Sequence, residues 1–372
     1  MSKQVKLGVV GTSWWTDAMY MPALTRHPNA DVRAVVGRDL DHTRKFAEQW
    51  NVPNAYAGVE DLLSNETVDA VIIATPNNDH YPLAMTAIGR GKHVLCEKPL
   101  AMNYTEAIHM AEAAERAGVK TMVPFTYRFM PTARYLKELL EQRYIGRPYH
   151  LNMRYYTGYG RDGKYMWRFD LGESGSGVVG DLGTHWLYLA DWFYGEVKAV
   201  SAMLGYHVSH GPRPDGKPYQ TADDSAVIML EFENGARGVL HVSSLAYEQT
   251  PFGQTHHMEF HGSGGTLYSF TDWDRTQRVS GARDGEGALH DLPIPDHLWG
   301  TARRDFVPDT YKDIFRDHDF MARGFVSAIA DNTSVEPSFR DGARIQRYLE
   351  AALLSAQEGR RVEVSEVQPE EI

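Results

Sequence analysis

Three polar residues of this 372-residue chain, Lys98, Asp181 and His185, have the side chains that the oxidation of an alcohol requires. One group must take the hydroxyl proton as a hydride leaves the carbon, and others must orient the alcohol and stabilise charge on its oxygen. Asp181 and His185 are four positions apart, so a helix that begins at Asp181 would carry both on one face. Taken alone, the pair is explained equally well by an N-cap aspartate followed by a packed histidine.

Lys98 belongs to one of two segments that follow predicted strands. Cys96-Glu97-Lys98-Pro99 comes at the end of a strand over 93–96, and Ala74-Thr75-Pro76-Asn77 at the end of a strand over 70–75. Pro99 restricts Lys98 to extended backbone, so the lysine side chain can be aimed at a crevice. Because doubly wound sheets bind ligands beyond the carboxyl ends of their strands, both segments are expected to line a site.

A third such segment follows the first predicted strand, over 5–10. In dinucleotide-binding folds this turn brings backbone N–H groups and a helix N-terminus against the pyrophosphate. Only Gly11 occupies its position in the G-x-G-x-x-G pattern, because Ser13 and Thr16 replace the second and third glycines. Ser13 is small and can donate to a phosphate, but an ordinary βα turn explains the segment as well. The cofactor contacts expected from this turn are Gly11, Thr12, Ser13, Trp14 and Trp15.

The end of the second predicted strand bears on the choice between NADP and NAD. An acidic residue is expected there if it binds the ribose of NAD, and this chain has Gly37-Arg38-Asp39. Gly37 leaves space for a 2′-phosphate and Arg38 offers a guanidinium fork to bind it. The pattern therefore favours NADP, although Asp39 keeps NAD open and an exposed loop cation remains the alternative for Arg38.

The pattern up to about residue 125 alternates short β-branched runs with amphipathic helical stretches. This alternation predicts an α/β fold with a parallel sheet that helices cover on both faces. Asp41 is expected to cap its helix, and Asn103 with Glu106 three residues later resembles a capping box. The expected strands are 5–10, 31–36, 70–75 and 93–96, and the expected helices end near 26 or cover 41–50 and 80–90.

The pattern changes after residue 125 to longer alternating stretches, which predict a largely antiparallel sheet with one covered face. Asn234-Gly235 lies between two of these stretches and predicts a hairpin. Gly and Asp residues between 280 and 296 indicate a surface loop. The expected strands are 147–156, 197–208, 225–232, 238–247 and 258–261, and the expected helices are 132–143, 184–193, 317–330 and 342–357. We expect one domain over 1–124 and a second over 125–372, with the helix 342–357 packing back on the first.

Composition excludes several classes of protein. The net charge of −11 argues against nonspecific binding of nucleic acid, which needs a basic surface. Apolar runs are too short to span a membrane, the first residues lack the apolar core of a signal peptide, and Cys96 is the single cysteine. We therefore expect a cytoplasmic protein. His256, His257 and His261 do not form a Cys/His set at zinc spacing, so no metal is expected.

Four motifs occur in a specific order along the chain: Glu97-Lys98-Pro99 after a strand, Tyr127-Arg128-Phe129, Trp167-Arg168, and Gly180-Asp181-x-Gly183-x-His185. Together they resemble the glucose–fructose oxidoreductase, inositol dehydrogenase and MocA family over residues 5–357. The resemblance implies an N-terminal Rossmann domain and a C-terminal domain with an open mixed sheet. One face of that sheet would cover the active site, and the other would join subunits into a homodimer or homotetramer.

The resemblance also implies roles for particular residues. His185 would be the principal acid/base, Lys98 would bind the hydroxyl or relay its proton, and Asp181 would orient the substrate. A tyrosine of the family falls, by counting back from Phe325, on His318. The further cofactor contacts implied are Thr75, Pro76, Asn77, His80, Glu97, Lys98, Arg128, Trp167 and Arg168. The substrate contacts implied are Lys98, Tyr127, Trp167, Asp181, His185 and His318.

The leading hypothesis is an NADP-preferring dehydrogenase or reductase that acts on a sugar, a sugar acid or a cyclitol. The same fold also carries glycosidases that use a tightly held NAD for transient oxidation, with no net redox change. A non-catalytic protein that senses the redox state of its cofactor is a third hypothesis. The presence of Lys98, Asp181 and His185 together disfavours this third hypothesis.

Overall fold

The computed structural model describes residues 3–65, 67–247, 254–272 and 277–371, and these form two compact units. The first unit contains the described residues of 3–125, 312–344 and 369–371. The second contains those of 126–311 and 345–368. Among the described residues no helix is long and apolar enough to cross a membrane.

The first unit is built on a six-stranded sheet whose paired strands all run parallel, in the order β3-β2-β1-β4-β5-β6. This is the strand order of a Rossmann fold, so the predicted doubly wound sheet is confirmed. The central strand β4 is buried at all four positions, as expected of a strand covered on both faces. The strands are β1 (Val5–Val10), β2 (Ala30–Val36), β3 (Asn54–Tyr56), β4 (Ala70–Ile73), β5 (His93–Cys96) and β6 (Thr121–Met122).

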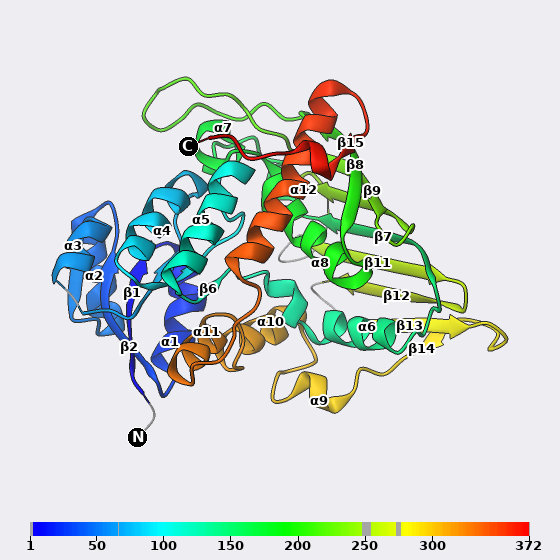
Figure 1. Cartoon of the computed structure of the whole chain (residues 1–372), viewed down its shortest axis with the longest axis horizontal. Coiled ribbons are helices and arrows are strands. Elements are labelled where there is room, and N and C mark those ends of the chain that lie inside the picture. Colours follow the sequence, from blue (N-terminus) through cyan, green and yellow to red (C-terminus); the bar gives the residue numbers. More distant parts are fainter. Residues whose placement is uncertain (1–2, 66, 248–253, 273–276, 372) are drawn as a thin grey trace. The chain divides into compact units, whose positions relative to one another are not determined.

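Helices cover both faces of this sheet. On one face α3, α4 and α5 pack in sequence, and α4 and α5 lie side by side in Figure 1. The other face has α1 packed against α11, which also contacts β1, β5 and β6. The helices of this unit are η1 (Thr16–Tyr20), α1 (Met21–Thr25), α2 (Leu40–Trp50), α3 (Val59–Asn65), η2 (Asn77–Asp79), α4 (His80–Gly89), α5 (Tyr104–Ala117) and α11 (Met321–Ala330).

Helix caps show how local chemistry sets these boundaries. Asn103 caps α5 as predicted, since its side chain accepts a bond from the Glu106 N–H at 2.8 Å. The prediction that Asp41 caps α2 is wrong. Asp39 is the cap, and its Oδ1 accepts the N–H groups of Asp41 and His42, each at 3.0 Å. Both aspartates suit the role by type, and the extended backbone of Asp39 is what selects it.

The chain returns to the first unit near its end. The predicted helix 317–330 begins instead at Met321, and Phe325, Val326 and Ile329 of α11 are buried in the first unit. The sequence-based boundary placed residues 312–344 in the second domain. Here they belong to the first unit, because the apolar side of α11 covers the parallel sheet. Of α12 (Phe339–Glu358), residues 339–344 belong to the first unit and residues 345–358 to the second.

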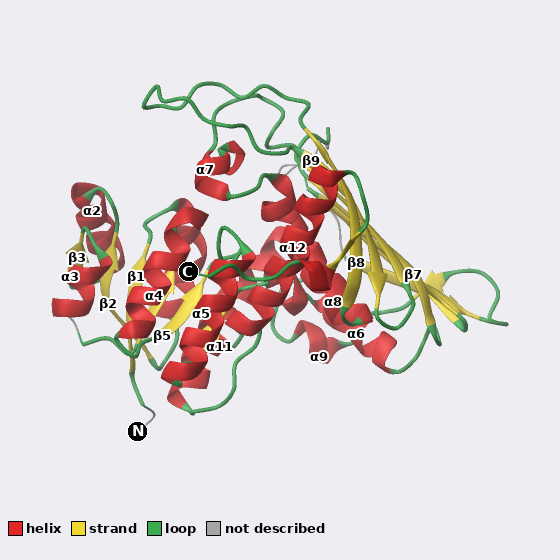
Figure 2. Cartoon of the chain, turned by 45° about the horizontal axis from the view of Figure 1, so that its top comes forward, coloured by secondary structure: helices red, strands yellow, loops and turns green. Residues whose placement is uncertain are grey.

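The second unit contains a nine-stranded sheet in the order β14-β13-β12-β11-β7-β10-β9-β8-β15, which Figure 2 shows as a twisted layer. Strands β7 and β10 pair in parallel and the other neighbours pair antiparallel, so the predicted mixed sheet is confirmed. Its strands are β7 (Pro148–Tyr156), β8 (Val197–Gly205), β9 (Ser225–Phe232), β10 (Arg237–Ser243), β11 (Thr255–Gly262), β12 (Gly265–Asp272), β13 (Arg278–Arg283), β14 (His290–Asp291) and β15 (Val362–Glu363).

Turn chemistry predicts one feature of this sheet correctly and misses another. Asn234-Gly235 forms the hairpin between β9 and β10, where Gly235 has a φ of 88°. The surface loop expected over 280–296 is wrong in part. Ser280 and Gly281 of β13 pair with Asp291 and His290 of β14. Glycine and aspartate disfavour strands locally, but here the edge of the sheet supplies the backbone partners.

One face of the large sheet is covered by helices, chiefly α8 (Thr184–Tyr194), which contacts β7 and β10. Burial alternates along β10, where Leu240 and Val242 face α8 and Val239 is exposed. Because α8 is anchored on this sheet, its first turn has a defined position. The remaining helices of this unit are η3 (Thr126–Phe129), α6 (Pro131–Glu141), η4 (Trp167–Phe169), α7 (Leu171–Ser174), η5 (Val179–Gly183), α9 (Asp296–Trp299), the first part of α10 (Val307–Arg316) and η6 (Val364–Glu366).

Candidate active site

The turn after β1 has a geometry that only glycine tolerates. Gly11 has a φ of 108°, and a Cβ there would lie 2.3 Å from the backbone oxygen of Ala74. Its N–H donates to the Val36 oxygen at 2.8 Å, which joins the ends of β1 and β2. The turn therefore presents bare backbone at the place where a Rossmann fold receives a pyrophosphate, which is the cradle that a dinucleotide requires.

The helix after this turn opens in an unusual way. Ser13 accepts a bond from the Thr16 N–H at 3.4 Å, and residues 16–20 form a π-helical turn before α1. Of the two tryptophans, Trp14 is 70% exposed, whereas Trp15 donates its indole N–H to Glu97 Oε1 at 2.8 Å. The indole of Trp15 is thus held by Glu97, on the segment that carries Lys98.

Glu97 is the centre of a small network that sequence analysis did not find. Its Oε1 accepts from Trp15 and from the Tyr20 hydroxyl at 2.7 Å, and its Oε2 accepts the Lys98 N–H at 3.1 Å. Phe315 of α10 is buried and packs edge-on against both aromatic rings. The network ties the glycine turn to the segment that carries Lys98, so these two parts of the first unit are held together.

The buried side chain of His80 lies between the segments that follow β4 and β5. It is fully buried, with its ring nitrogens 2.9 Å from the Pro99 oxygen and 3.1 Å from the Thr75 oxygen. Burial lowers the pKa of His80, although both backbone oxygens favour its protonated form. Asn77 on the same segment is 5% exposed. The imidazole of His80 thus links the segments after β4 and β5, which is a positioning role and leaves no ring nitrogen facing a ligand.

Arg38 and Asp39, the two residues that bear on the choice between NADP and NAD, follow the end of β2 and have different surroundings. Arg38 is exposed and makes no ion pair with any residue that the structure describes. Asp39 uses its carboxylate to cap α2, and the backbone bond from His42 is the main reason that its pKa is lowered. A Cβ at Gly37 would lie 2.5 Å from Thr43 Oγ1, so the threonine side chains leave little room for a larger residue there.

In the second unit, Asp181 and His185 lie one turn apart on a continuous helical segment, with Asp181 in η5 and His185 in α8. Asp181 does not begin this helix, contrary to the sequence-based expectation. The cap comes from Asp223, a buried side chain whose two oxygens accept the Gly177 and Val179 N–H groups, each at 2.8 Å. Burial raises the pKa of Asp223 to about 6. Asp181 is thereby released from capping.

Two donors hold the carboxylate of Asp181 instead. Its Oδ2 accepts the Tyr159 hydroxyl at 2.8 Å and the Arg168 Nε–H at 3.1 Å. The side chain of Asp181 is 17% exposed, and the guanidinium of Arg168 also lies 4.6 Å above the ring of Trp167. Burial and the nearby Asp181 charge raise the pKa of Tyr159 well above 10, so the phenol remains a donor. An oriented carboxylate of this kind can bind a hydroxyl group.

The ring of His185 rests on a buried aromatic group. Tyr127 packs edge-on against it, with ring centroids 4.8 Å apart. The Tyr127 hydroxyl lies 2.6 Å from that of Tyr155, and Gln254 donates to both at 2.8 and 2.7 Å. Tyr127 is 8% exposed, so its ring packs against His185 inside the second unit.

Two domains of one sequence family together match most of this chain. Residues 5–125 match the oxidoreductase family with an NAD-binding Rossmann fold, and residues 133–268 match the GFO/IDH/MocA C-terminal domain. The chain belongs to the Gfo/Idh/MocA family. The resemblance inferred from the motifs is thus confirmed, and the protein is an NAD(P)-dependent oxidoreductase.

Named relatives of this family cover nearly the same length. The levoglucosan dehydrogenase of Pseudarthrobacter phenanthrenivorans is 28% identical over 360 residues, 91% of either chain. An NADP⁺-dependent scyllo-inositol 2-dehydrogenase of Bacillus subtilis is 29% identical over 78% of this chain and 83% of its own. The structure of a levoglucosan dehydrogenase with NADH and levoglucosan superimposes with a TM-score of 0.86 at 24% identity, covering 98% and 100% of the two chains, which shows the shared fold.

The remaining motif residues of this Gfo/Idh/MocA member have structural partners. Arg128, which the motifs imply as a cofactor contact, donates to the Tyr188 hydroxyl and lies 5.2 Å above the ring of Trp192. It thereby supports α8. His318 lies in the turn between α10 and α11, in the first unit, with its ring stacked at 6.0 Å on Phe320. No cluster of three His, Cys, Asp or Glu side chains suited to a metal occurs among the described residues.

Several site residues of this oxidoreductase are invisible to motif analysis. Tyr159 and Asp223 act through partners 22 and 44 positions away in the chain, and Tyr20 through Glu97, 77 positions away. The one available signal was the unusual number of tyrosines, 20 in all. Count alone could not tell the tyrosines of the site from those of the core.

Proposed function

We propose that the chain transfers a hydride between its nicotinamide cofactor and a hydroxyl-bearing carbon of a sugar, a sugar derivative or a cyclitol. Two relatives with 28% and 29% identity are named for levoglucosan and for scyllo-inositol, which supports this class of substrate. The observation that carries the proposal is the held carboxylate of Asp181, one helical turn before His185. A carboxylate fixed by two donors suits a hydroxyl-rich ligand.

Each residue of the proposed site has a separate task. Asp181 orients the substrate hydroxyl, His185 takes or returns its proton, and Lys98 stabilises the charge on the same oxygen. The nicotinamide, when bound, accepts or supplies the hydride. Gly11 and its neighbours Thr12 and Ser13 hold the pyrophosphate with their backbone, and Glu97 keeps the Lys98 segment in place through Trp15 and Tyr20.

We propose further that NADP is preferred over NAD. Preference for NAD usually depends on a carboxylate that accepts the ribose hydroxyls. Here Asp39 uses its Oδ1 for two backbone N–H groups of α2, whereas the exposed guanidinium of Arg38 has no competing anion among the described residues. A free guanidinium at the end of β2 is suited to a 2′-phosphate.

Arg38→Asp tests this preference. The substitution removes the fork and adds a charge that repels the phosphate, so the ratio of kcat/KM for NADP to that for NAD should fall about 100-fold. Steady-state kinetics with both cofactors give the ratio. Arg33→Asp, at a 41% exposed position within β2, is the matched control and should leave it unchanged. An unaltered preference in the Arg38 variant would show that this residue does not recognise the phosphate.

The proposed reaction itself is tested by turnover. The protein is mixed with NADP or NAD and, one at a time, with sugars, sugar acids and cyclitols, while the absorbance of the reduced nicotinamide is followed. We expect net reduction of the cofactor with at least one polyol. Cleavage of an aryl glycoside without net cofactor reduction, together with no turnover of any polyol, would contradict the dehydrogenase and favour a transient-oxidation glycosidase.

We also propose that the exposed face of the large sheet joins copies of the chain into a homodimer or homotetramer. Met203, Met229 and Phe270 are 67%, 51% and 42% exposed on this face, and Val239 pairs with Met229 across β9 and β10. Such apolar side chains on a sheet face favour association. Sedimentation should show a multiple of the single-chain mass for the native protein and a single chain for Met229→Glu. A monomeric native protein would rule the assembly out.

A further inference from the structure

Two long segments of the second unit, residues 159–175 and 206–222, run together, and we call this pair the hood. The Gly211 N–H donates to the Gly163 oxygen at 2.7 Å, and the N–H groups of Leu171 and Ala222 donate to the oxygens of Gln220 and Phe169, each at 2.9 Å. His210 stacks on Phe169 with ring centroids 3.9 Å apart. Hydrogen bonds and a ring stack therefore join the two segments of the hood, although 30 residues separate them in the chain.

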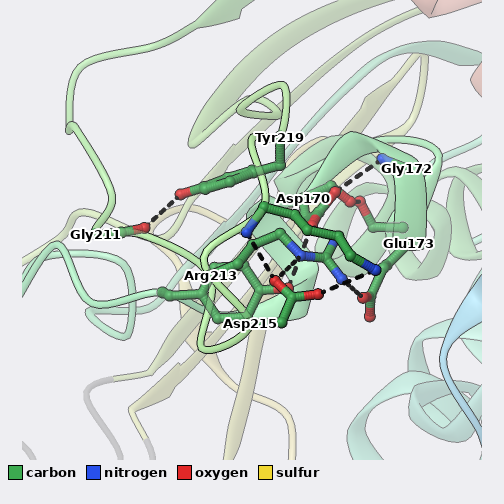
Figure 3. Close-up of polar contacts among 10 residues, drawn as sticks. Asp170, Gly172, Glu173, Gly211, Arg213, Asp215 and Tyr219 are labelled. Atoms are coloured by element: carbon green, nitrogen blue, oxygen red, sulfur yellow. Dashed lines mark hydrogen bonds and ion pairs between the residues drawn. The ribbon is translucent and has the colours of Figure 1, made fainter.

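Arg213 is the charged centre of the hood. Figure 3 shows its guanidinium among three carboxylates, those of Asp170, Glu173 and Asp215. The bonds to Glu173 and Asp215 measure 2.8 and 3.2 Å, and Asp170 is in direct contact. The side chain of Asp170 is 2% exposed, so the arginine neutralises a charge that would otherwise be buried alone.

Asp170 connects this ion cluster to the site. It ends the η4 turn that carries Trp167 and Arg168, and it caps α7 by accepting the Gly172 N–H at 3.0 Å. The Tyr165 hydroxyl donates to its other oxygen at 3.2 Å, so the turn is held on both sides. Two positions before Asp170, Arg168 binds Asp181, the carboxylate that we propose orients the substrate.

We propose that Arg213 is a positioning residue for the active site, acting through Asp170 on the turn that holds Arg168 against Asp181. This inference rests on the proposed function for the role of Asp181. The hood thereby influences the proposed site, because a small displacement of the η4 turn moves a donor on the carboxylate that we propose binds the substrate. Misplacement by about 1 Å can cost about 100-fold in rate.

The first test needs no substrate. Hydrogen exchange of the intact protein is measured for peptides covering 159–175 and 206–222 in the native chain, Arg213→Gln and Arg213→Lys. Gln leaves Asp170 and Glu173 unneutralised, so these peptides should exchange at least about 10-fold faster. Lys retains the charge without the fork and should give an intermediate rate. Lys217→Gln removes a neighbouring cation that is 77% exposed and that, among the described residues, pairs with Asp215 alone, and it should match the native chain.

The second test asks whether Arg213 acts through Arg168. Arg213→Gln should lower kcat/KM about 10- to 100-fold in the native background, but by less than about threefold when Arg168 is already Met. A merely structural role would lower activity equally in both backgrounds. Equal losses in the two backgrounds, or hood exchange within threefold of the native rate in Arg213→Gln, would overturn the inference. Absence of turnover in the native chain would instead contradict the proposed function. The hydrogen exchange of the hood peptides would still test the role of Arg213, because it needs no substrate.

Discussion

Lys98→Ala is expected to reduce kcat at least about 1,000-fold while NADPH still binds with nearly native affinity. The ammonium group is proposed to stabilise charge on the substrate oxygen, an interaction that strengthens only as the hydride moves, so its loss lowers kcat. Cofactor binding should survive, because the Gly11 cradle is backbone and the bonds of Trp15 and Tyr20 to Glu97 are made without the lysine side chain. Stopped-flow kinetics and NADPH fluorescence measure the two quantities separately.

Lys92→Ala is the matched control for this experiment. Lys92 precedes β5 and Lys98 follows it, so the two lysines lie at opposite ends of one strand. Ligands of a parallel sheet bind at the carboxyl ends of its strands, and the Lys92 variant should therefore keep native kcat. Full activity in Lys98→Ala would refute the chemistry assigned to this residue, whereas weak NADPH binding would assign the lysine to the cofactor instead.

His185→Asn is expected to lower kcat/KM about 100- to 10,000-fold, the usual contribution of a general acid or base. Asparagine keeps a polar group against Tyr127 but cannot exchange a proton at neutral pH. The pH dependence of kcat/KM for oxidation should flatten in this variant, because the rate no longer depends on the deprotonation of residue 185. Rates measured from pH 5 to 10, a range of about five units around neutrality, test the expectation.

A second histidine gives this prediction its control. His256 also lies edge-on to Tyr127, with centroids 4.8 Å apart, and Gln254 bonds to its Nε2 at 2.9 Å. Burial lowers the pKa of His256 to about 3, so it stays neutral throughout the assay range. His256→Asn should therefore keep the native pH dependence, even if packing changes reduce the rate. Loss of the pH dependence in His256→Asn but not in His185→Asn would show that the proton carrier was misassigned.

Local chemistry was enough to predict much of the fold. The apolar runs ending at Val10, Val36 and Cys96 are parallel strands, and the last three residues of each are buried, as expected in a sheet covered on both faces. The predicted cap at Asn103 and the predicted hairpin at Asn234-Gly235 are confirmed, because caps and hairpin turns depend on bonds within a few residues. The prediction that Asp41 caps α2 is wrong, because Asp39 lies only two positions away and has the same side chain.

The sequence by itself determined that the chain has a parallel and a mixed sheet, belongs to an oxidoreductase family, and carries Lys98, Asp181 and His185 in motif positions. Only the tertiary structure decided which residues orient them. Asp223 caps the helix of Asp181, Tyr159 and Arg168 hold its carboxylate, and Arg213 neutralises Asp170 from 43 positions away. Such partners leave no periodic or local signal, because a hydrogen bond depends on distance in space and not on separation along the chain.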